Sequence, residues 1–105
     1  MNYREAKERA KVLKAIAHPM RILIVVALKN EDRCGRDLCA LGQISQSNVS
    51  RHLAMLKRAG IVSDRRVKTR VFYKLETPSV LKMLDPAAEA VRVDSQRRNA
   101  RTQLI

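Results

Sequence analysis

The sequence has few aromatic residues: no tryptophan, two tyrosines and one phenylalanine among 105 residues. A surface that stacks the bases of single strands or RNA would need more of them. Acidic residues are also scarce, because 10 aspartates and glutamates stand against 22 lysines and arginines, which gives a formal net charge of +12. An excess of this size predicts a polyanionic partner. The composition therefore favours a nucleic-acid-binding protein without a base-stacking surface.

Long apolar runs are absent as well. The longest, from Ile22 to Leu28, is far shorter than the roughly 20 residues that cross a bilayer. The first residues are charged and contain no apolar secretion signal, so we expect a cytoplasmic protein. In that compartment Cys34 and Cys39 are expected to be reduced thiols and not a structural disulfide. The length of the chain is that of one small domain.

The sequence does contain a helix with two contrasting faces, between Ser45 and Gly60. Val49, Leu53 and Leu56 have the i, i+4, i+7 spacing of an apolar stripe. Ser45 is a favourable N-cap, and Gly60 suits the position after the last turn. The opposite face has no acidic residue and contains Gln46, Ser47, Asn48, Ser50, Arg51, Lys57 and Arg58. A solvated surface helix normally mixes both signs of charge, so we predict a helix that reads the DNA major groove.

The residues before this helix predict a helix-turn-helix. Tyr3–Ile16 is expected to form an amphipathic helix, and Pro19 suits the first turn of a buried apolar helix that ends near Asn30. A short helix from about Gly35 to Leu41 then precedes a turn that contains a glycine. Two short helices joined in this way predict a helix-turn-helix over residues 35–59.

After Gly60 the apolar period changes from that of a helix to two. Residues 61–75 predict an antiparallel hairpin, the wing, with strands at 61–66 and 70–75 around the turn 67–69. The inward positions are Val71, Tyr73 and Leu75, and the outward ones are Arg70, Phe72 and Lys74. We expect four cations to contact DNA phosphates: Arg65, Arg66, Lys68 and Arg70. The alternative is that these charges protect an exposed sheet edge from pairing.

The remaining residues predict helices that join two chains. Residues 78–98 are expected to be helical, with Pro86 interrupting or restarting the helix and Asp85 as its cap, while residues 99–105 form a fraying tail. The apolar faces of helices 1–16 and 78–98 are too large for a small monomer to bury, so we predict a homodimer paired through them. Two recognition helices would bind a palindromic duplex operator. The predicted fold class is mainly α with a small antiparallel β-hairpin, a winged helix-turn-helix.

Three segments resemble the ArsR/SmtB family of metal- and metalloid-responsive winged-helix repressors. LKAIAHPMR, from Leu13 to Arg21, resembles the family's opening LKALAHPTR. SRHLAMLKRAGIV, from Ser50 to Val62, resembles SRHLALLREAGLV, and VFYKL, from Val71 to Leu75, is similar to the wing strand VYYRL. The wing lacks the family's usual glycine at its tip. The resemblance implies a homodimer that binds a palindromic operator in the absence of ligand and is released by one.

The two cysteines are the candidate residues for binding a releasing ligand. CGRDLC, from Cys34 to Cys39, resembles the CVCDLC of arsenical repressors, with Arg36 at the middle ligand position. The resemblance implies As(III) or Sb(III) as an inducer bound by Cys34 and Cys39, through two sulfurs in place of three. Residues five apart lie about 140° apart around a helix, so both sulfurs reach one ion only if Cys34 precedes the helix or its first turn unwinds. Thiol redox sensing and incidental, ligand-independent cysteines are the alternatives.

The two histidines do not suggest a further site. No histidine follows His52, so the family's zinc site between the carboxy-terminal helices is absent. His18 is expected to cap or pack, and His52 to contact DNA, with partial packing as the alternative. No catalytic constellation is found, so we predict no enzyme and no obligatory cofactor. The sequence predicts a repressor of a metalloid- or metal-resistance operon; a non-specific basic nucleic-acid binder is a competing hypothesis, which sequence preference would exclude.

Overall fold

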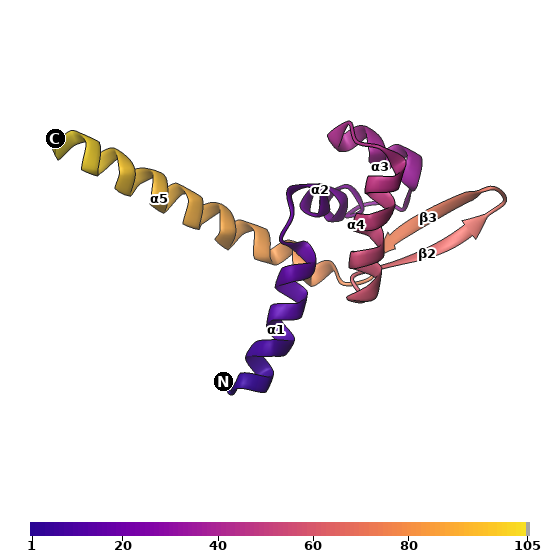
Figure 1. Ribbon diagram of the computed structural model, residues 1–105, viewed down its shortest axis with the longest axis horizontal. Helices are drawn as coiled ribbons and strands as arrows, with labels where there is room; N and C mark the ends of the chain where they lie inside the picture. Colours follow the sequence, from indigo (N-terminus) through magenta and orange to yellow (C-terminus); the bar gives the residue numbers. More distant parts are fainter. Residues whose placement is uncertain (105) are drawn as a thin grey trace.

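The computed structural model describes the backbone of residues 1–104 and the side chains of residues 1–100. This part of the chain forms helices around one small antiparallel sheet (Figure 1). In chain order the elements are α1 (Tyr3–Ile16), α2 (Pro19–Ala27), β1 (Arg33–Cys34), α3 (Gly35–Gly42), α4 (Gln46–Arg58), β2 (Val62–Val67), β3 (Arg70–Leu75), the 3-10 helix η1 (Pro78–Met83) and α5 (Leu84–Leu104). The predicted fold class, mainly α with a winged helix-turn-helix, is confirmed.

The core lies where α2, α3 and α4 meet the base of the sheet. The predicted apolar stripe of α4 is buried in it, with Val49, Leu53 and Leu56 at most 2% exposed. Ile24 of α2 and Leu38 of α3 are also fully buried. Burial of this stripe fixes the rotation of α4, so its polar residues face away from the core.

Local capping defines where the helices begin and end. The Ser45 hydroxyl accepts a hydrogen bond from the Asn48 backbone N–H at 3.2 Å, which confirms Ser45 as the N-cap of α4. Gly60 follows the last turn with φ +77°, the left-handed conformation that glycine adopts without strain. His18 caps α2, because its Nδ1 accepts from the Met20 N–H at 3.0 Å. The sequence placed the end of α2 near Asn30, whereas the helix ends at Ala27.

The sheet has one strand more than the predicted hairpin. Its order is β1-β3-β2, and the two-residue β1 pairs Cys34 with Phe72. The wing turn is Lys68-Thr69, one residue shorter than predicted, and Lys68 takes φ 58° where the family usually has glycine. Leu75 is buried and Tyr73 packs against the core, as predicted. Phe72, predicted to face outward, is half-buried because the Arg65 guanidinium covers its ring.

The carboxy-terminal helix differs from the sequence-based prediction. Of the two predicted alternatives for Pro86, the structure agrees with a restart. The 3-10 helix η1 ends at Met83 and α5 begins at Leu84, and a proline in the first turn of α5 breaks no helical hydrogen bond. Asp85 therefore lies inside the first turn and is not the cap. The helix also continues beyond residue 98 to Leu104, so residues 99–104 of the predicted tail are helical; residue 105 lies outside the described residues.

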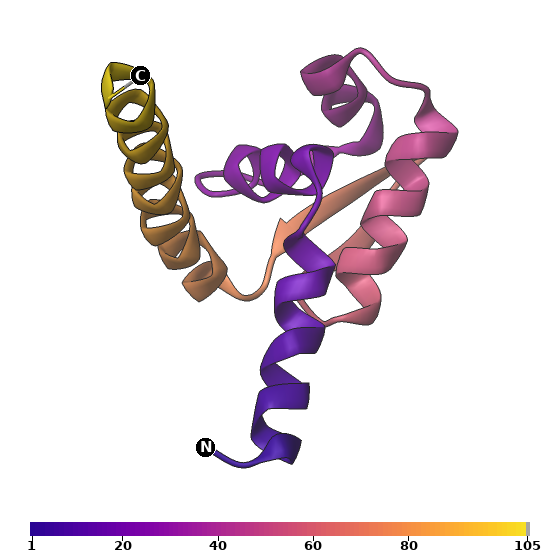
Figure 2. The ribbon, with the colours of Figure 1, turned by 60° about the vertical axis from the view of Figure 1, so that its left-hand side comes forward.

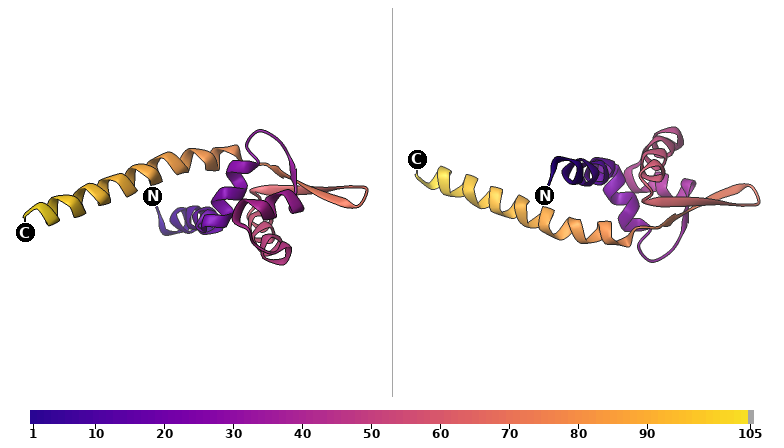
Figure 3. Two further views of the ribbon diagram at one scale, coloured as in Figure 1. Left: turned by 90° about the horizontal axis from the view of Figure 1, so that it is seen from above. Right: turned by 90° about the horizontal axis from the view of Figure 1, so that it is seen from below.

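Two helices extend from the body of the protein. Figure 1 shows α1 and α5 pointing away from the sheet, and Figure 2 shows α5 standing apart from α1 and α4. The main neighbour of α5 is η1. The views from above and below agree that its outer turns lie far from the other elements (Figure 3). None of the helices described is both long and apolar enough to span a membrane.

Candidate nucleic-acid interface

The turn between α3 and α4 sets the position of the predicted recognition helix. At the end of α3, a Cβ added to Gly42 would lie 2.6 Å from the sulfur of Met20 in α2, so α3 and α2 approach closely here. Gln43 takes the left-handed φ of 52° and ends α3. The chain then reaches the Ser45 cap within two residues, and α4 starts in a new direction. This is the geometry of a helix-turn-helix.

The polar face of α4 is exposed along its whole length. Its exposed residues are Gln46, Ser47, Asn48, Ser50, Arg51, Lys57 and Arg58. The Ser45 and Ser47 hydroxyls lie 3.1 Å apart, so Ser47 takes part in the cap. Short polar side chains at the amino end and cations behind them suit a major groove, as the sequence indicated. Contact of these residues with DNA stays a prediction.

Ion pairs divide the predicted DNA-binding cations into two groups. Lys57 Nζ lies 2.9 Å from a carboxylate oxygen of Asp64. Arg65 pairs with Asp32, and its guanidinium carbon lies 5.5 Å from the centre of the Phe72 ring. The other group has no acidic partner within ion-pair distance among the described side chains and consists of Arg51, Arg66, Lys68 and Arg70. The cations of the second group can bind phosphates without first breaking an ion pair. Lys57 and Arg65 must first break their ion pairs with Asp64 and Asp32.

His52 lies between α2 and α4 and not on the open face. It is half-buried, and its ring centroid is 4.2 Å from that of His18. Burial lowers the pKa of the His52 imidazole below its usual value, and nearby His18, Arg21 and Arg51 lower that pKa further. The lowered pKa favours the neutral form of the imidazole. This placement favours the packing alternative over a charged DNA contact.

Cys34 lies immediately before α3 and Cys39 lies inside it, in different surroundings. Cys34 is the N-cap residue, 5% exposed, and makes no side-chain capping hydrogen bond. Cys39 lies inside the helix, where its thiol donates to the Gly35 carbonyl at 3.3 Å and packs against the core. Cys34 thus precedes the helix, which is the first of the two alternatives under which both sulfurs could reach one ion. Among the described residues, no group of three or more His, Cys, Asp or Glu side chains is placed to hold a metal.

Arg36 belongs to the polar surface formed by α3, α4 and the wing, although it was not among the residues predicted to bind DNA. It lies in the first turn of α3 and faces a cavity that Gln46 and Ser50 of α4 and Arg70 of the wing also line. Arg36 and Arg70 are 34 residues apart, so no local pattern could have joined them. The helix-turn-helix and the wing thus meet at one polar surface.

Comparison of the chain with known proteins assigns it to a family of bacterial regulators. The model described as "Bacterial regulatory protein, arsR family" matches residues 18–64, from the cap of α2 into β2. The chain is 41% identical over 64 residues to the HTH-type transcriptional repressor SmtB of Mycobacterium tuberculosis, a match that covers 61% of this chain and 47% of that repressor. The chain therefore spans about half the length of that relative. It is also 36% identical over 93 residues to the uncharacterized HTH-type transcriptional regulator Rv0081 of the same species, covering 87% of this chain and 82% of Rv0081.

Solved structures show the same fold. NolR from Sinorhizobium fredii has a TM-score of 0.75 and 34% identity, covering 84% of this chain and 88% of NolR. The Mycobacterium bovis protein Mb0332, described as a homodimeric winged helix-turn-helix DNA-binding domain, has a TM-score of 0.69 and 25% identity, covering 90% and 93%. These similarities confirm the predicted winged helix and point to transcription regulators, not enzymes.

Proposed function

Because the chain belongs to the ArsR/SmtB family of winged-helix regulators, we propose that it represses transcription by binding a palindromic operator as a homodimer. The observation that carries this proposal is the exposed, acid-free face of α4 beside a wing with unpaired cations. Short polar groups on α4 read base edges, and Arg66, Lys68 and Arg70 hold the phosphates beside them. Bound at a promoter, such a dimer excludes the transcription machinery.

The terminal helices support a dimer. Every described side chain of α5 from Asp85 onward is exposed, and α1 projects from the body (Figures 1 and 2). The exposed large apolar residues of these helices and of η1 are Met83, Tyr3, Leu13, Val91 and Val93. A second copy would bury them and bring two α4 helices to half-sites about 34–36 Å apart.

Selection from a random duplex pool tests the operator proposal. An inverted repeat should be enriched and bind at least about 1,000-fold more tightly than random duplex. On it, Arg51→Ala is expected to weaken binding by about 1–3 kcal/mol and relax base preference, because Arg51 lies on the reading face. Lys68→Ala should weaken all sequences equally and lower the salt slope by about one unit per half-site. Equal affinity for all duplexes, or unchanged affinity of both variants at matched salt, would contradict the proposal.

We also propose Cys34 and Cys39 as the site of an inducer, trivalent arsenic or antimony, with solvent or a small thiol as third ligand. The position of Cys34 before the helix supports this, because only the Cys39 thiol must leave its carbonyl partner. Both thiols must deprotonate, so affinity should rise with pH until both are thiolates. Binding would move the Cys39 thiol away from the Gly35 carbonyl and so distort α3, the helix that precedes the turn into α4.

The Cys34→Ser, Cys39→Ser double variant tests the inducer. Arsenite is expected to release the natural protein from its operator and to leave the double variant bound. Release of the double variant would place the sensing site elsewhere. Release of the natural protein by peroxide alone would favour the redox alternative, in which these thiols are oxidised. A complex that neither reagent dissociates would indicate a ligand-independent regulator.

A further inference from the structure

A cavity of about 260 Å³ lies between the first turn of α3, the amino-terminal half of α4 and the start of β3. Its lining includes the buried residues Cys34, Val49 and Leu53. Its polar wall consists of Arg36, Gln46, Ser50, Thr69 and Arg70. No acidic side chain of the described residues lines it. A cavity with cations and neutral donors but no carboxylate suits an anion.

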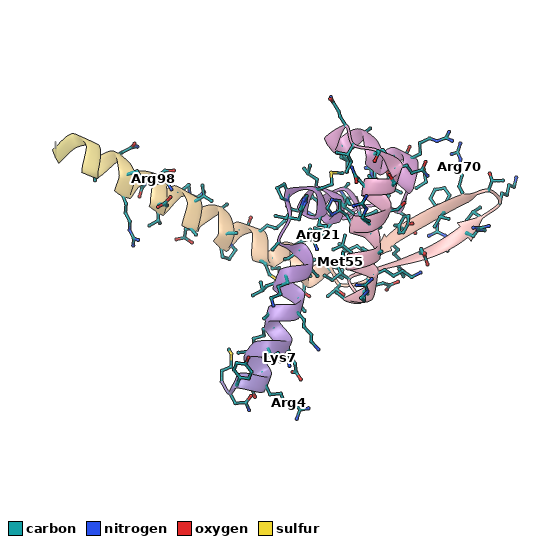
Figure 4. The ribbon with its side chains drawn as sticks, viewed as in Figure 1. Arg4, Lys7, Arg21, Met55, Arg70 and Arg98 are labelled. Carbon is teal, nitrogen blue, oxygen red and sulfur yellow. The ribbon has the colours of Figure 1, made fainter. Side chains whose placement is uncertain are left out.

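The two arginines at this cavity are unpaired. Neither Arg36 nor Arg70 has an acidic partner within ion-pair distance in the described part of the chain, in contrast to Arg65 on the neighbouring strand. Figure 4 shows Arg70 leaving the wing on the side where α3 lies. Two guanidinium groups on one opening can donate several hydrogen bonds to a tetrahedral oxyanion.

The backbone at the cavity also carries partial positive charge, from helix amino termini. Gly35 begins α3 and Gln46 begins α4, so two helix amino termini border the cavity. Cys34, the cap residue of α3, accepts no hydrogen bond through its side chain, so the first N–H groups of that helix lack a side-chain partner. Helix amino termini attract anions through these groups. The termini add to the arginines and the cavity, which carry the inference.

We propose that this cavity holds one phosphate of the DNA backbone, contacted by Arg36 and Arg70. The inference rests on the proposed function, which places α4 in one groove and the wing along the adjacent backbone. The DNA strand between these two contacts must pass the junction of α4 and the wing. The cavity lies at this junction, because Ser50 of α4 and Thr69 of the wing turn both line it. Arg36, which occupies the middle ligand position of the family's cysteine motif, thereby becomes a DNA-contact residue. The phosphate also closes the cavity over Cys34.

Neutralising single phosphates tests the contact directly. Operators that carry one methylphosphonate at each backbone position in turn are titrated with the natural protein and with Arg36→Ala. One position in each half-site should weaken natural binding by about ten-fold. The same position should have a clearly smaller effect on Arg36→Ala, because only Arg70 then remains to contact that phosphate. That variant should also lower the salt slope by about one unit per half-site. Lys82→Ala, an exposed cation on η1, is the matched control and should change neither quantity.

A free anion is the other source of the same chemistry. Inorganic phosphate, added at constant ionic strength without DNA, would then raise the melting temperature of the natural protein and not that of Arg36→Ala. Such a shift, with no methylphosphonate position coupled to Arg36, would assign the cavity to a free anion and overturn the DNA contact. An Arg36→Ala variant with natural affinity, salt slope and phosphate profile would overturn the site altogether. If Arg51→Ala still weakens binding, the phosphate site alone has failed; if it does not, the docking of α4 has failed.

Discussion

Replacing Leu56 with alanine is expected to lower the free energy of unfolding by about 2–5 kcal/mol. The Leu56 side chain is 0% exposed, on the face of α4 that packs against the core. Truncation removes apolar contacts and leaves a void that the surrounding helices fill only in part. Total stabilities of about 5–15 kcal/mol are usual for domains, so this loss is a large fraction. Urea denaturation at one fixed protein concentration measures it, since a dimer's stability depends on concentration.

The neighbouring Met55 provides the control for this substitution. Its side chain is 43% exposed and lies about 100° around the same helix from Leu56, so Met55→Ala should cost well under half as much. Both substitutions place alanine in mid-helix, so helix propensity favours neither variant. Similar losses for Met55→Ala and Leu56→Ala would contradict the rotation of α4 described here, and with it the outward direction of the polar face.

Local signals were sufficient for both ends of α4 and for the start of α2. The spacing of Val49, Leu53 and Leu56 gave the buried face of α4, and Ser45 and Gly60 gave its ends, because capping depends on neighbouring residues alone. The same holds for His18 at the start of α2. Where such short-range groups decide a boundary, the sequence analysis agreed with the structure.

Long-range contacts decided the features that were missed. β1 has two residues, too few to show a period of two, and exists because β3, nearly 40 residues later, pairs with it. That pairing also buries Cys34, whose sequence neighbours Arg33 and Gly35 gave no sign of it. The half-burial of Phe72 depends in the same way on Arg65 across the wing.

The sequence predicted which cations lie at the DNA-binding site but not which of them are already paired with acidic side chains. A count of cations treats Lys57, Arg65 and Arg70 alike, whereas only Arg70 of these three lacks an acidic partner among the described residues. Asp32, which pairs with Arg65, lies before β1, far from the wing in sequence. Pairing across the fold therefore has to be known before phosphate contacts are assigned.

The second large effect is expected from the proposed dimer interface. Leu13→Asp with Val91→Asp should convert the dimer to a monomer, because it puts two carboxylates on each chain into an apolar contact. Leu13 is 52% exposed on α1 and Val91 is 67% exposed on α5 in the single chain. A helix of 21 residues with so little of its own chain packed against it needs a partner to be stable. Sedimentation at micromolar concentration should give half the natural mass.

The same variant tests how dimerisation supports operator binding. Two linked half-sites gain roughly 100- to 10,000-fold in affinity over one, so the monomer should lose about that much on an inverted repeat and little on an isolated half-site. Leu41→Asp is the control, because Leu41 is also 41% exposed but lies on α3, outside the terminal helices. It should leave the mass unchanged. A double variant that stays dimeric would show that α1 and α5 do not form the interface. A monomeric variant with natural affinity for the inverted repeat would show that each chain recognises its operator alone.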